Sequence, residues 1–272
     1  MIIGISKESL PGETRVALLP PEIKRLLSDN LTFNIETEAG TGSFISDEKY
    51  IESGAEIIPD VYLNSDLIIR INPPTEGEVS KLKEGSCLVS LLAPFTNHEL
   101  VKQLAAKNIS SFCLELIPRS TYAQSMDVLS SQATVAGYRA VLNAASHMGK
   151  FFPMLMTPAG TIKPATILII GAGVAGLQAI ATASRLGAKV EAFDVRPAAR
   201  EQVESLGAKF LYMDLDDSAE TDSGYAIEMN DEFIRKEMEL LHDASKRVDA
   251  IITTALIFGK KAPILIKDYM VN

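Results

Sequence analysis

A glycine-rich stretch between residues 166 and 194 constrains the fold of this 272-residue chain more than any other feature. An apolar run at 167–170 leads into Gly171, Gly173 and Gly176, a helix-forming stretch follows, and a second apolar run ends at Asp194. In a strand–turn–helix unit the first glycine makes the turn, the second lets the backbone approach a pyrophosphate, and the third lets the helix pack against the strand.

The acid at the end of the second strand decides between two interpretations of these glycines. A glycine-rich turn that binds no ligand explains the glycines but not the carboxylate. The distance along the chain from Gly176 to Asp194 is close to that expected between the last glycine and an acid that binds the ribose. The stretch therefore predicts a dinucleotide site with phosphates at the helix N-terminus.

Composition excludes several classes of protein. The formal net charge of −9 gives no support to nucleic-acid binding. Cys87 and Cys113 lack CxxC spacing and lie in apolar runs, so we expect buried free thiols and a reducing compartment. The N-terminus does not resemble a signal peptide. No run of about 18 apolar residues is present, so no membrane span is expected.

The first half of the chain alternates between strand and helix patterns. This alternation predicts an α/β fold with a parallel sheet and helices on both faces. We expect strands at 2–5, 33–36, 55–58, 67–70, 88–92 and 111–116, and helices at 20–27, 47–53 and 97–107.

The second half predicts another doubly wound parallel sheet. We expect a long helix at 133–148, a proline-rich loop at 151–164, strands at 166–170, 189–193, 209–211 and 250–254, a polar loop at 221–230, a helix at 231–247 and a short helix after Pro263. The predicted domains are a flavodoxin- or Rossmann-like domain at 1–132, a bridge at 133–164 and a Rossmann domain at 165–272. A complete dinucleotide fold has six strands, so we expect the second domain to be truncated at its C-terminus.

A polar stretch between residues 119 and 132 is a candidate for ligand binding. Arg119, Gln124, Asp127 and Ser130 follow a predicted strand and precede the long helix. Glutamine and serine supply both donors and acceptors, as a nicotinamide carboxamide requires. The alternative is a solvated loop in which Asp127 or Ser130 caps the next helix.

Two further groups of residues have simpler interpretations. Arg15 can bind a carboxylate with two hydrogen bonds, or it can form a surface ion pair with Glu13 or Glu8. The three histidines, His98, His147 and His242, are not clustered and show no metal-ligand spacing, so no metal site is expected.

Four segments carry a resemblance to a known family. Residues 171–210, 119–141, 222–233 and 252–266 resemble domain I of the alpha subunit of proton-translocating NAD(P) transhydrogenases. The four segments read GAGVAGLQAIATASRLGAKVEAFDVRPAAREQVESLGAKF, RSTYAQSMDVLSSQATVAGYRAV, DSGYAIEMNDEF and ITTALIFGKKAPILI. The similarity extends from the KES-PGE-RVAL start to the last residue.

The resemblance implies roles for particular positions. For the nicotinamide end it implies Arg119, Gln124 and Asp127, with Ser130 beside them. For the rest of the nucleotide it implies Gly171, Gly173, Val174 and Gly176 at the pyrophosphate, Asp194 at the adenosine ribose flanked by Val195 and Arg196, a mobile loop at Gly224 and Tyr225, and Leu256 near the nicotinamide. Asp194 favours NAD over NADP because a 2′-phosphate would meet a carboxylate, and Arg196 weakens that preference.

The resemblance also implies an activity and an assembly. The chain would be the NAD(H)-binding component of a Re/Si-specific, proton-translocating transhydrogenase that passes a hydride directly to NADP⁺ on a partner domain. The expected partners are the NADP-binding beta subunit or domain III, a membrane domain, and a second copy of the full-length chain. The expected location is the cytoplasmic face of the inner membrane, reached through those partners.

Two alternatives remain open at this point. Alanine dehydrogenase shares the fold, and Arg15 matches an arginine that handles pyruvate in that enzyme. The positions of its substrate-handling lysine and histidine are Asn72 and Ala93 here, which argues against amino-acid chemistry. The second alternative is an NAD-binding module without turnover.

Overall fold

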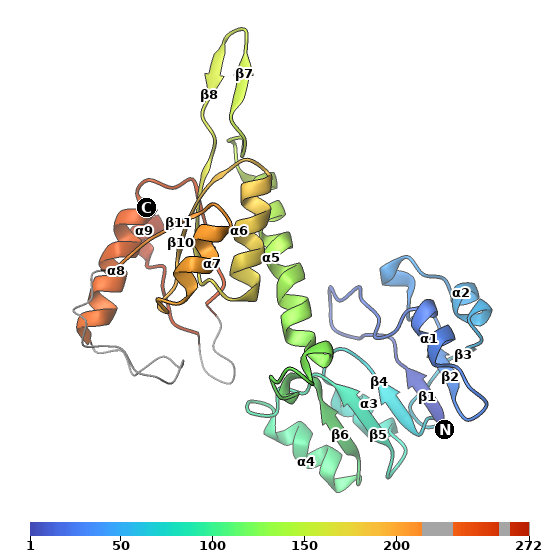
Figure 1. The fold of residues 1–272 in the computed structure, drawn as a ribbon. Coiled ribbons are helices and arrows are strands. Elements are labelled where there is room, and N and C mark those ends of the chain that lie inside the picture. The colour runs from blue at the N-terminus through green and yellow to red at the C-terminus, as the bar shows by residue number, and fades with distance from the viewer. Residues whose placement is uncertain (214–230, 256–261, 272) are drawn as a thin grey trace. The chain divides into compact units, whose positions relative to one another are not determined.

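The computed structural model describes residues 1–213, 231–255 and 262–271. The chain forms two compact units, Met1–Leu129 and Ser130–Asn272, and each has its own parallel sheet (Figure 1). The predicted α/β class is confirmed in both. No helix in the described ranges combines the length and the apolar character needed to cross a bilayer.

Unit 1 (Met1–Leu129) contains a six-stranded parallel sheet in the order β3-β2-β1-β4-β5-β6. This is the strand order of the doubly wound dinucleotide-binding fold. The strands are β1 (Ile2–Ile5), β2 (Thr32–Glu36), β3 (Glu56–Ile58), β4 (Leu67–Ile69), β5 (Cys87–Ser90) and β6 (Ser110–Cys113). The helices are α1 (Pro20–Leu26), α2 (Asp47–Glu52), α3 (Glu76–Lys81) and α4 (His98–Ala106).

Alternation along β1 separates two cores in unit 1. Ile3 and Ile5 face the cluster that contains buried residues of α1 and α2. Gly4 lies opposite Ile68, which belongs to the cluster that contains buried residues of α3 and α4. Helices therefore cover both faces of the sheet, as expected for a parallel sheet.

Unit 2 (Ser130–Asn272) contains a four-stranded parallel sheet in the order β11-β10-β9-β12. The strands are β9 (Thr166–Ile170), β10 (Lys189–Phe193), β11 (Lys209–Phe210) and β12 (Ala250–Thr253). The helices are α5 (Val128–His147), α6 (Val174–Arg185), α7 (Ala199–Ser205), α8 (Asp231–Ser245) and α9 (Asp268–Val271).

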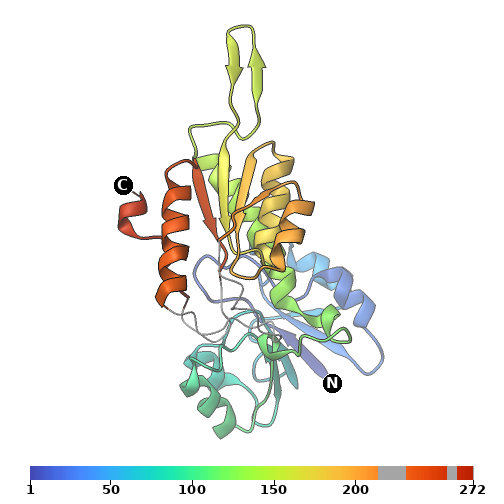
Figure 2. The same ribbon diagram turned by 60° about the vertical axis from the view of Figure 1, so that its left-hand side comes forward.

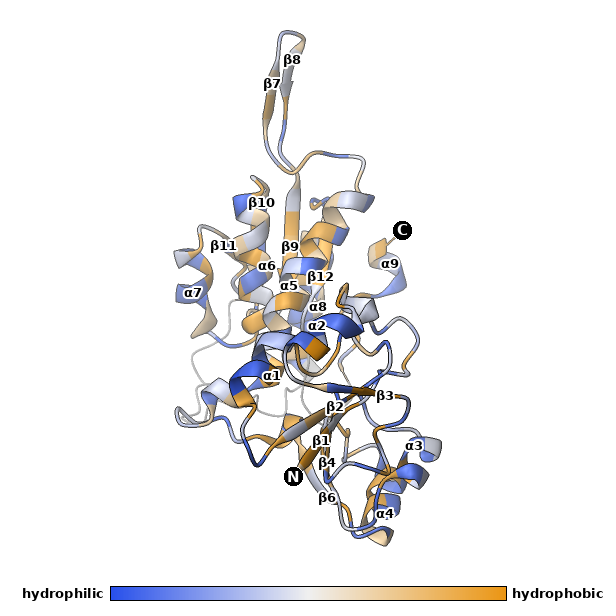
Figure 3. Cartoon of the chain, turned by 90° about the vertical axis from the view of Figure 1, so that its right-hand side faces the viewer, coloured by the Kyte–Doolittle hydropathy of each residue, from blue (hydrophilic) through white to orange (hydrophobic). Residues whose placement is uncertain are grey.

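Strand β9 is the centre of this second core. Ile167 and Ile169 pack with α5, α6 and α7, whereas Leu168 and Ile170 pack with α8. The two groups of helices lie on opposite faces of the sheet in both views (Figures 1 and 2). Burial on both faces explains why the β9 segment is continuously apolar, as its colour shows (Figure 3).

The structure corrects three expectations. The proline-rich segment contains an antiparallel hairpin, β7 (Leu155–Thr157) and β8 (Gly160–Ile162), where a loop was predicted; its turn is Pro158 and Ala159. The hairpin stands away from the sheet (Figure 2). Helix α3 was missed, although the Thr75–Glu78 capping box marks its start. Cys87 and Cys113 are free but only half-buried.

Candidate functional site

The carboxyl end of β9 continues into a tight turn that the structure holds from two sides. Gly171 has a φ of +97°, a conformation that glycine adopts without steric cost. Its N–H donates to the carbonyl of Phe193 at 2.7 Å, and the hydroxyl of Thr254 donates to its carbonyl at 2.8 Å. The ends of β9, β10 and β12 therefore meet at this residue.

The other two glycines have different steric requirements. A Cβ at Gly176 would collide with the Gly171 carbonyl and would lie 3.0 Å from the Thr254 hydroxyl. A Cβ at Gly173 would meet no atom within 4 Å. Gly176 thus permits α6 to pack on the turn, while Gly173 leaves open space beside the helix N-terminus. This arrangement fits a pyrophosphate, because Gly173 is the N-cap of α6 and the helix N-terminus favours negative charge.

Two residues, one at this turn and one beside the start of α6, were missed from the sequence. Thr254 supplies the hydroxyl described above, and it lies 83 positions from Gly171. Gly137 in α5 allows a similar close contact, because a Cβ there would collide with the carbonyl of Ala175 in α6. The only sequence signal for Thr254 is its place at the predicted end of a buried strand. Gly137 has no signal beyond being a glycine within a helix.

Asp194 lies directly after β10, beside the glycine turn. Its Oδ2 accepts the N–H of Ala172 at 2.7 Å, so the carboxylate is joined to the turn itself. Its Oδ1 accepts the backbone N–H and the Nε of Arg196, both at 2.9 Å. The side chain of Asp194 is only 7% exposed, whereas that of Arg196 is 52% exposed.

These contacts set the charge of the pair. Burial raises the pKa of Asp194, but hydrogen bonds from Arg196 and Ala172 outweigh burial and hold the pKa below its ordinary value. The hydrogen bond to Asp194 raises the pKa of Arg196. Asp194 is therefore an ionised hydrogen-bond acceptor at neutral pH.

Strand order explains why these residues come together. The chain leaves β9 toward β10 on one side, and β12 lies on the other side of β9. Ligands of open α/β sheets bind outside the carboxyl ends of the strands where the order reverses. Val174, the first residue of α6, is 45% exposed at this point, and Val195 packs against the core cluster that contains Phe193.

Of the predicted nicotinamide residues, Arg119, Gln124 and Asp127 lie at the end of unit 1, and Ser130 is the first residue of unit 2. Arg119 and Gln124 are exposed, and Gln124 begins a short 3-10 helix, η3 (Gln124–Met126). Asp127 is half-buried and directly precedes α5, and Ser130 is half-buried in that helix. A series of turns shapes the segment, because Ala123, Met126 and Asp127 each donate to a carbonyl three positions earlier. Gly224, Tyr225 and Leu256 lie outside the described residues.

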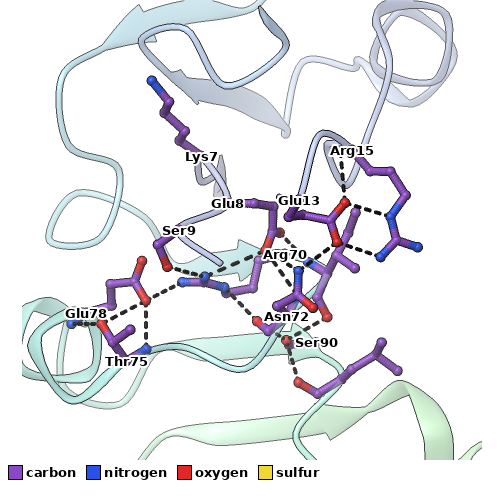
Figure 4. Close-up of polar contacts among 12 residues, drawn as sticks. Lys7, Glu8, Ser9, Glu13, Arg15, Arg70, Asn72, Thr75, Glu78 and Ser90 are labelled. Atoms are coloured by element: carbon purple, nitrogen blue, oxygen red, sulfur yellow. Dashed lines mark hydrogen bonds and ion pairs between the residues drawn. The ribbon is translucent and has the colours of Figure 1, made fainter. Parts of the chain in front are cut away.

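Unit 1 holds a buried charge cluster at its own strand-order reversal (Figure 4). The side chain of Arg70, just beyond β4, is 0% exposed. Its Nη1 lies 2.9 Å from Glu78 Oε2 and donates to the Tyr62 hydroxyl at 2.7 Å, and its Nη2 lies 3.7 Å from Glu8 Oε2. Burial raises the pKa of Glu78, but hydrogen bonds from Thr75 and the charge of Arg70 lower it below the ordinary value.

Asn72 joins two carboxylates in the same cluster. Its amide nitrogen donates to Glu8 and to Glu13, each at 3.0 Å. Glu13 also accepts from Arg15, with the Nη2 of Arg15 at 2.6 Å, so the structure shows the ion pair that was one of two interpretations of Arg15. The hydrogen bond from Arg15, opposed by burial and assisted by Asn72, lowers the pKa of Glu13 to about 2.

The described ranges contain no group of three or more His, Cys, Asp and Glu side chains that could hold a metal ion. The glycine turn with Asp194 offers groups of a different kind for a ligand. It supplies backbone donors for phosphate and a carboxylate acceptor for hydroxyl groups.

Comparison with known proteins gives the family of the chain. The family description "Alanine dehydrogenase/PNT, N-terminal domain" matches residues 4–136, and "Alanine dehydrogenase/PNT, C-terminal domain" matches residues 140–272. The NAD(P) transhydrogenase subunit alpha of Haemophilus influenzae is 44% identical over the whole chain, which spans 53% of that protein. An NAD(P) transhydrogenase subunit alpha polypeptide of Rhodospirillum rubrum is 46% identical, and the chain spans 73% of it.

Solved structures give the same result. A transhydrogenase structure from Sinorhizobium meliloti aligns with a TM-score of 0.89 at 43% identity, covering all of this chain and 74% of the other. An L-alanine dehydrogenase aligns with a TM-score of 0.77 at 24% identity, which shows a common fold. The chain therefore belongs to the alanine dehydrogenase/PNT family, and among these relatives it is more similar to the transhydrogenases.

Proposed function

We propose that this chain is the NAD(H)-binding component of a proton-translocating NAD(P) transhydrogenase. The observation that carries the proposal is the Gly171–Gly176 turn with the Asp194 carboxylate hydrogen-bonded to it. The transhydrogenase names of the relatives support the reaction class.

In the proposed site, each part of the turn binds one part of the cofactor. The N–H groups at the start of α6 bind the pyrophosphate, and open space at Gly173 admits it. Asp194 accepts hydrogen bonds from the adenosine ribose. Its negative charge favours NAD(H) over NADP(H), because a 2′-phosphate would approach a carboxylate.

The bound nicotinamide supplies a hydride, which passes directly to NADP⁺ on a partner domain. Both reactants are nicotinamides, so the protein needs no general acid or base. The contribution left to the protein is positioning, because a near-attack geometry brings the reacting atoms to about 3–3.5 Å. Arg119, Gln124, Asp127 and Ser130 are the residues proposed to orient the nicotinamide.

The proposed partners follow from the same relationship. The chain spans about half of the H. influenzae alpha subunit. In this proposal a membrane domain carries out proton translocation. We assign NADP(H) to a beta subunit or domain III, and the membrane domain holds the complex on the cytoplasmic face of the inner membrane. A homodimer of the full-length protein is part of the proposal, and exposed Met156 and Ile162 on the hairpin, with Met154 directly before it, offer it apolar surface.

Unit 1 supports this function over alanine dehydrogenase. In the comparison made from sequence, Asn72 and Ala93 occupy the positions of the lysine and histidine that handle pyruvate. The Asn72 amide is bonded to Glu8 and Glu13, and Arg15 is paired with Glu13. These residues therefore form an internal network in place of a set of free cations for a carboxylate substrate.

Nucleotide titration tests the proposal first. Reduced-nicotinamide fluorescence should show saturable binding of NADH and much weaker binding of NADPH. Addition of an NADP-binding transhydrogenase domain should then restore hydride transfer between nucleotides. Pyruvate- and ammonia-dependent oxidation of NADH without a partner would instead support alanine dehydrogenase. Binding of NADH without transfer in the mixture would support a non-catalytic module.

Replacing Asp194 with asparagine is expected to weaken NADH binding about ten- to a hundredfold. The variant loses a charge-assisted acceptor, and hydrogen bonds to charged groups contribute about 1.5–3 kcal/mol. NADPH binding should change less, so the ratio of the dissociation constant of NADPH to that of NADH should decrease. The control is Asp243→Asn, which removes the same charge from an exposed residue of α8 paired with Lys246. Equal loss for both nucleotides would contradict the assigned role.

Replacing Gln124 with leucine is expected to slow hydride transfer about tenfold while the dissociation constant of NADH changes less than about threefold. The substitution keeps the side-chain size but removes the amide that is proposed to orient the carboxamide, and misplacement of a reactant by 1 Å can cost about a hundredfold in rate. Single-turnover mixing with the NADP-binding domain measures the rate. Gln103→Leu, on α4, is the control. Equal loss of rate and affinity would exclude the role.

A further inference from the structure

Asp194 has little capacity left for a ribose. Its Oδ2 accepts from Ala172 N at 2.7 Å and from Arg196 Nη2 at 3.0 Å, and its Oδ1 accepts from Arg196 N and Nε, both at 2.9 Å. An ionised carboxylate has about four lone-pair positions for hydrogen bonds. The two hydroxyl groups of a ribose would therefore compete with donors that are already in place.

The four donors differ in how easily each can move away from the Asp194 carboxylate. Ala172 N belongs to the glycine turn, which the bond from Gly171 N to the Phe193 carbonyl fixes. Arg196 N belongs to the backbone two residues beyond Asp194. The guanidinium of Arg196 is on a side chain that is 52% exposed, so it alone can rotate into solvent.

We propose that Arg196 is a specificity-determining residue whose guanidinium competes with the adenosine ribose for the carboxylate of Asp194. Binding of the ribose hydroxyls displaces Nε and Nη2 and leaves the two backbone donors in place. Binding of the ribose therefore breaks the ion pair between the half-exposed Arg196 guanidinium and the buried Asp194 carboxylate. This inference rests on the proposed NAD(H) site.

The expected size of the effect follows from the guanidinium, which is the half-exposed partner and can exchange its bonds to the buried Asp194 carboxylate for bonds to water. Exposed ion pairs contribute about 0.2–1 kcal/mol, which corresponds to a factor of about 1.5 to 5 in affinity. Removal of the guanidinium should therefore strengthen the contribution of the ribose hydroxyls by up to about fivefold. It should also remove a positive charge that attracts phosphate, so total affinity alone is a poor readout.

A comparison of two nucleotides separates these effects. Isothermal titration calorimetry would measure ADP and 2′,3′-dideoxyadenosine diphosphate, which carry the same phosphates but differ in the ribose hydroxyls. The readout is the ratio of the two dissociation constants, in the wild type and in Arg196→Ala and Arg196→Gln. The loss of charge affects both nucleotides alike and cancels in this ratio.

The proposal expects the ratio in favour of ADP to rise about two- to fivefold in both Arg196 variants. The matched control is Arg200→Ala, which removes an equally exposed arginine paired with Glu204 on α7 and should leave the ratio unchanged. A ratio that is unchanged or lower in the Arg196 variants overturns the inference while NADH binding stands. No saturable NADH or ADP binding by the wild type overturns the proposed function, and the inference with it.

Discussion

Replacing Gly176 with alanine is expected to destabilise unit 2 by about 1–3 kcal/mol and to weaken NADH binding at least about tenfold. The added Cβ would overlap the carbonyl of Gly171, which is backbone and cannot rotate away. Helix α6 must then move off the turn, and its N-terminus moves with it. Chemical denaturation followed by circular dichroism measures the stability, and nucleotide titration measures the affinity.

Gly173→Ala separates stability from binding in the same loop. Gly173 has a φ of −77°, which an alanine adopts, and a Cβ there meets no protein atom within 4 Å. We expect unchanged unfolding but weaker NADH binding, because the methyl group occupies the space proposed for the pyrophosphate. Gly149→Ala, which also points into open space, is the neutral control. If Gly173→Ala binds NADH as tightly as the wild type, the pyrophosphate does not bind at this turn.

Replacing Arg70 with methionine is expected to lower the free energy of unfolding of unit 1 by about 3–5 kcal/mol. Methionine fills part of the same space but leaves Glu78 and the nearly buried Glu8 without their common cation. It also removes the donors for the Tyr62 hydroxyl and the Asn72 carbonyl. Calorimetry should show the melting temperature of the affected transition lowered by about 10–20 °C.

The control for Arg70→Met is the same substitution at an exposed arginine of unit 1. Arg25 on α1 is exposed, and Arg25→Met should change stability by less than about 0.5 kcal/mol. The double variant that combines Arg70→Met with Glu8→Gln should recover part of the lost free energy of unfolding, because it removes one of the two carboxylates left without a cation. A melting temperature that matches that of Arg25→Met would show that the cluster contributes nothing to folding.

Local patterns predicted the elements that local forces determine. The β1 and β9 segments were predicted with the observed limits, because apolar runs bounded by polar or glycine residues mark buried strands. Helix α3 was missed because Gly77 and three charged residues weaken its pattern, although its capping box was present in the sequence. The hairpin β7–β8 was missed because its strands are very short, with Pro158 in the turn and Gly160 as the first residue of β8.

The candidate site was accessible from sequence only in part. The glycines and Asp194 lie within one βαβ unit, so their spacing alone predicts that they meet. The Thr254 hydroxyl reaches the Gly171 carbonyl from a strand 83 positions further along the chain, and spacing says nothing of such a contact. The fourfold occupation of the Asp194 oxygens also became visible only with the side chains placed.

The amino-acid sequence by itself determined the α/β class, the glycine turn and the acid beside it, because these depend on periodicity and on contacts within about thirty residues. Tertiary structure alone decided which residues close that turn and how buried charges are neutralised. Arg70 meets Glu8 across 62 positions because β1 and β4 pair in the sheet. Burial removes water from such groups, so their charges must find partners wherever the fold brings them together.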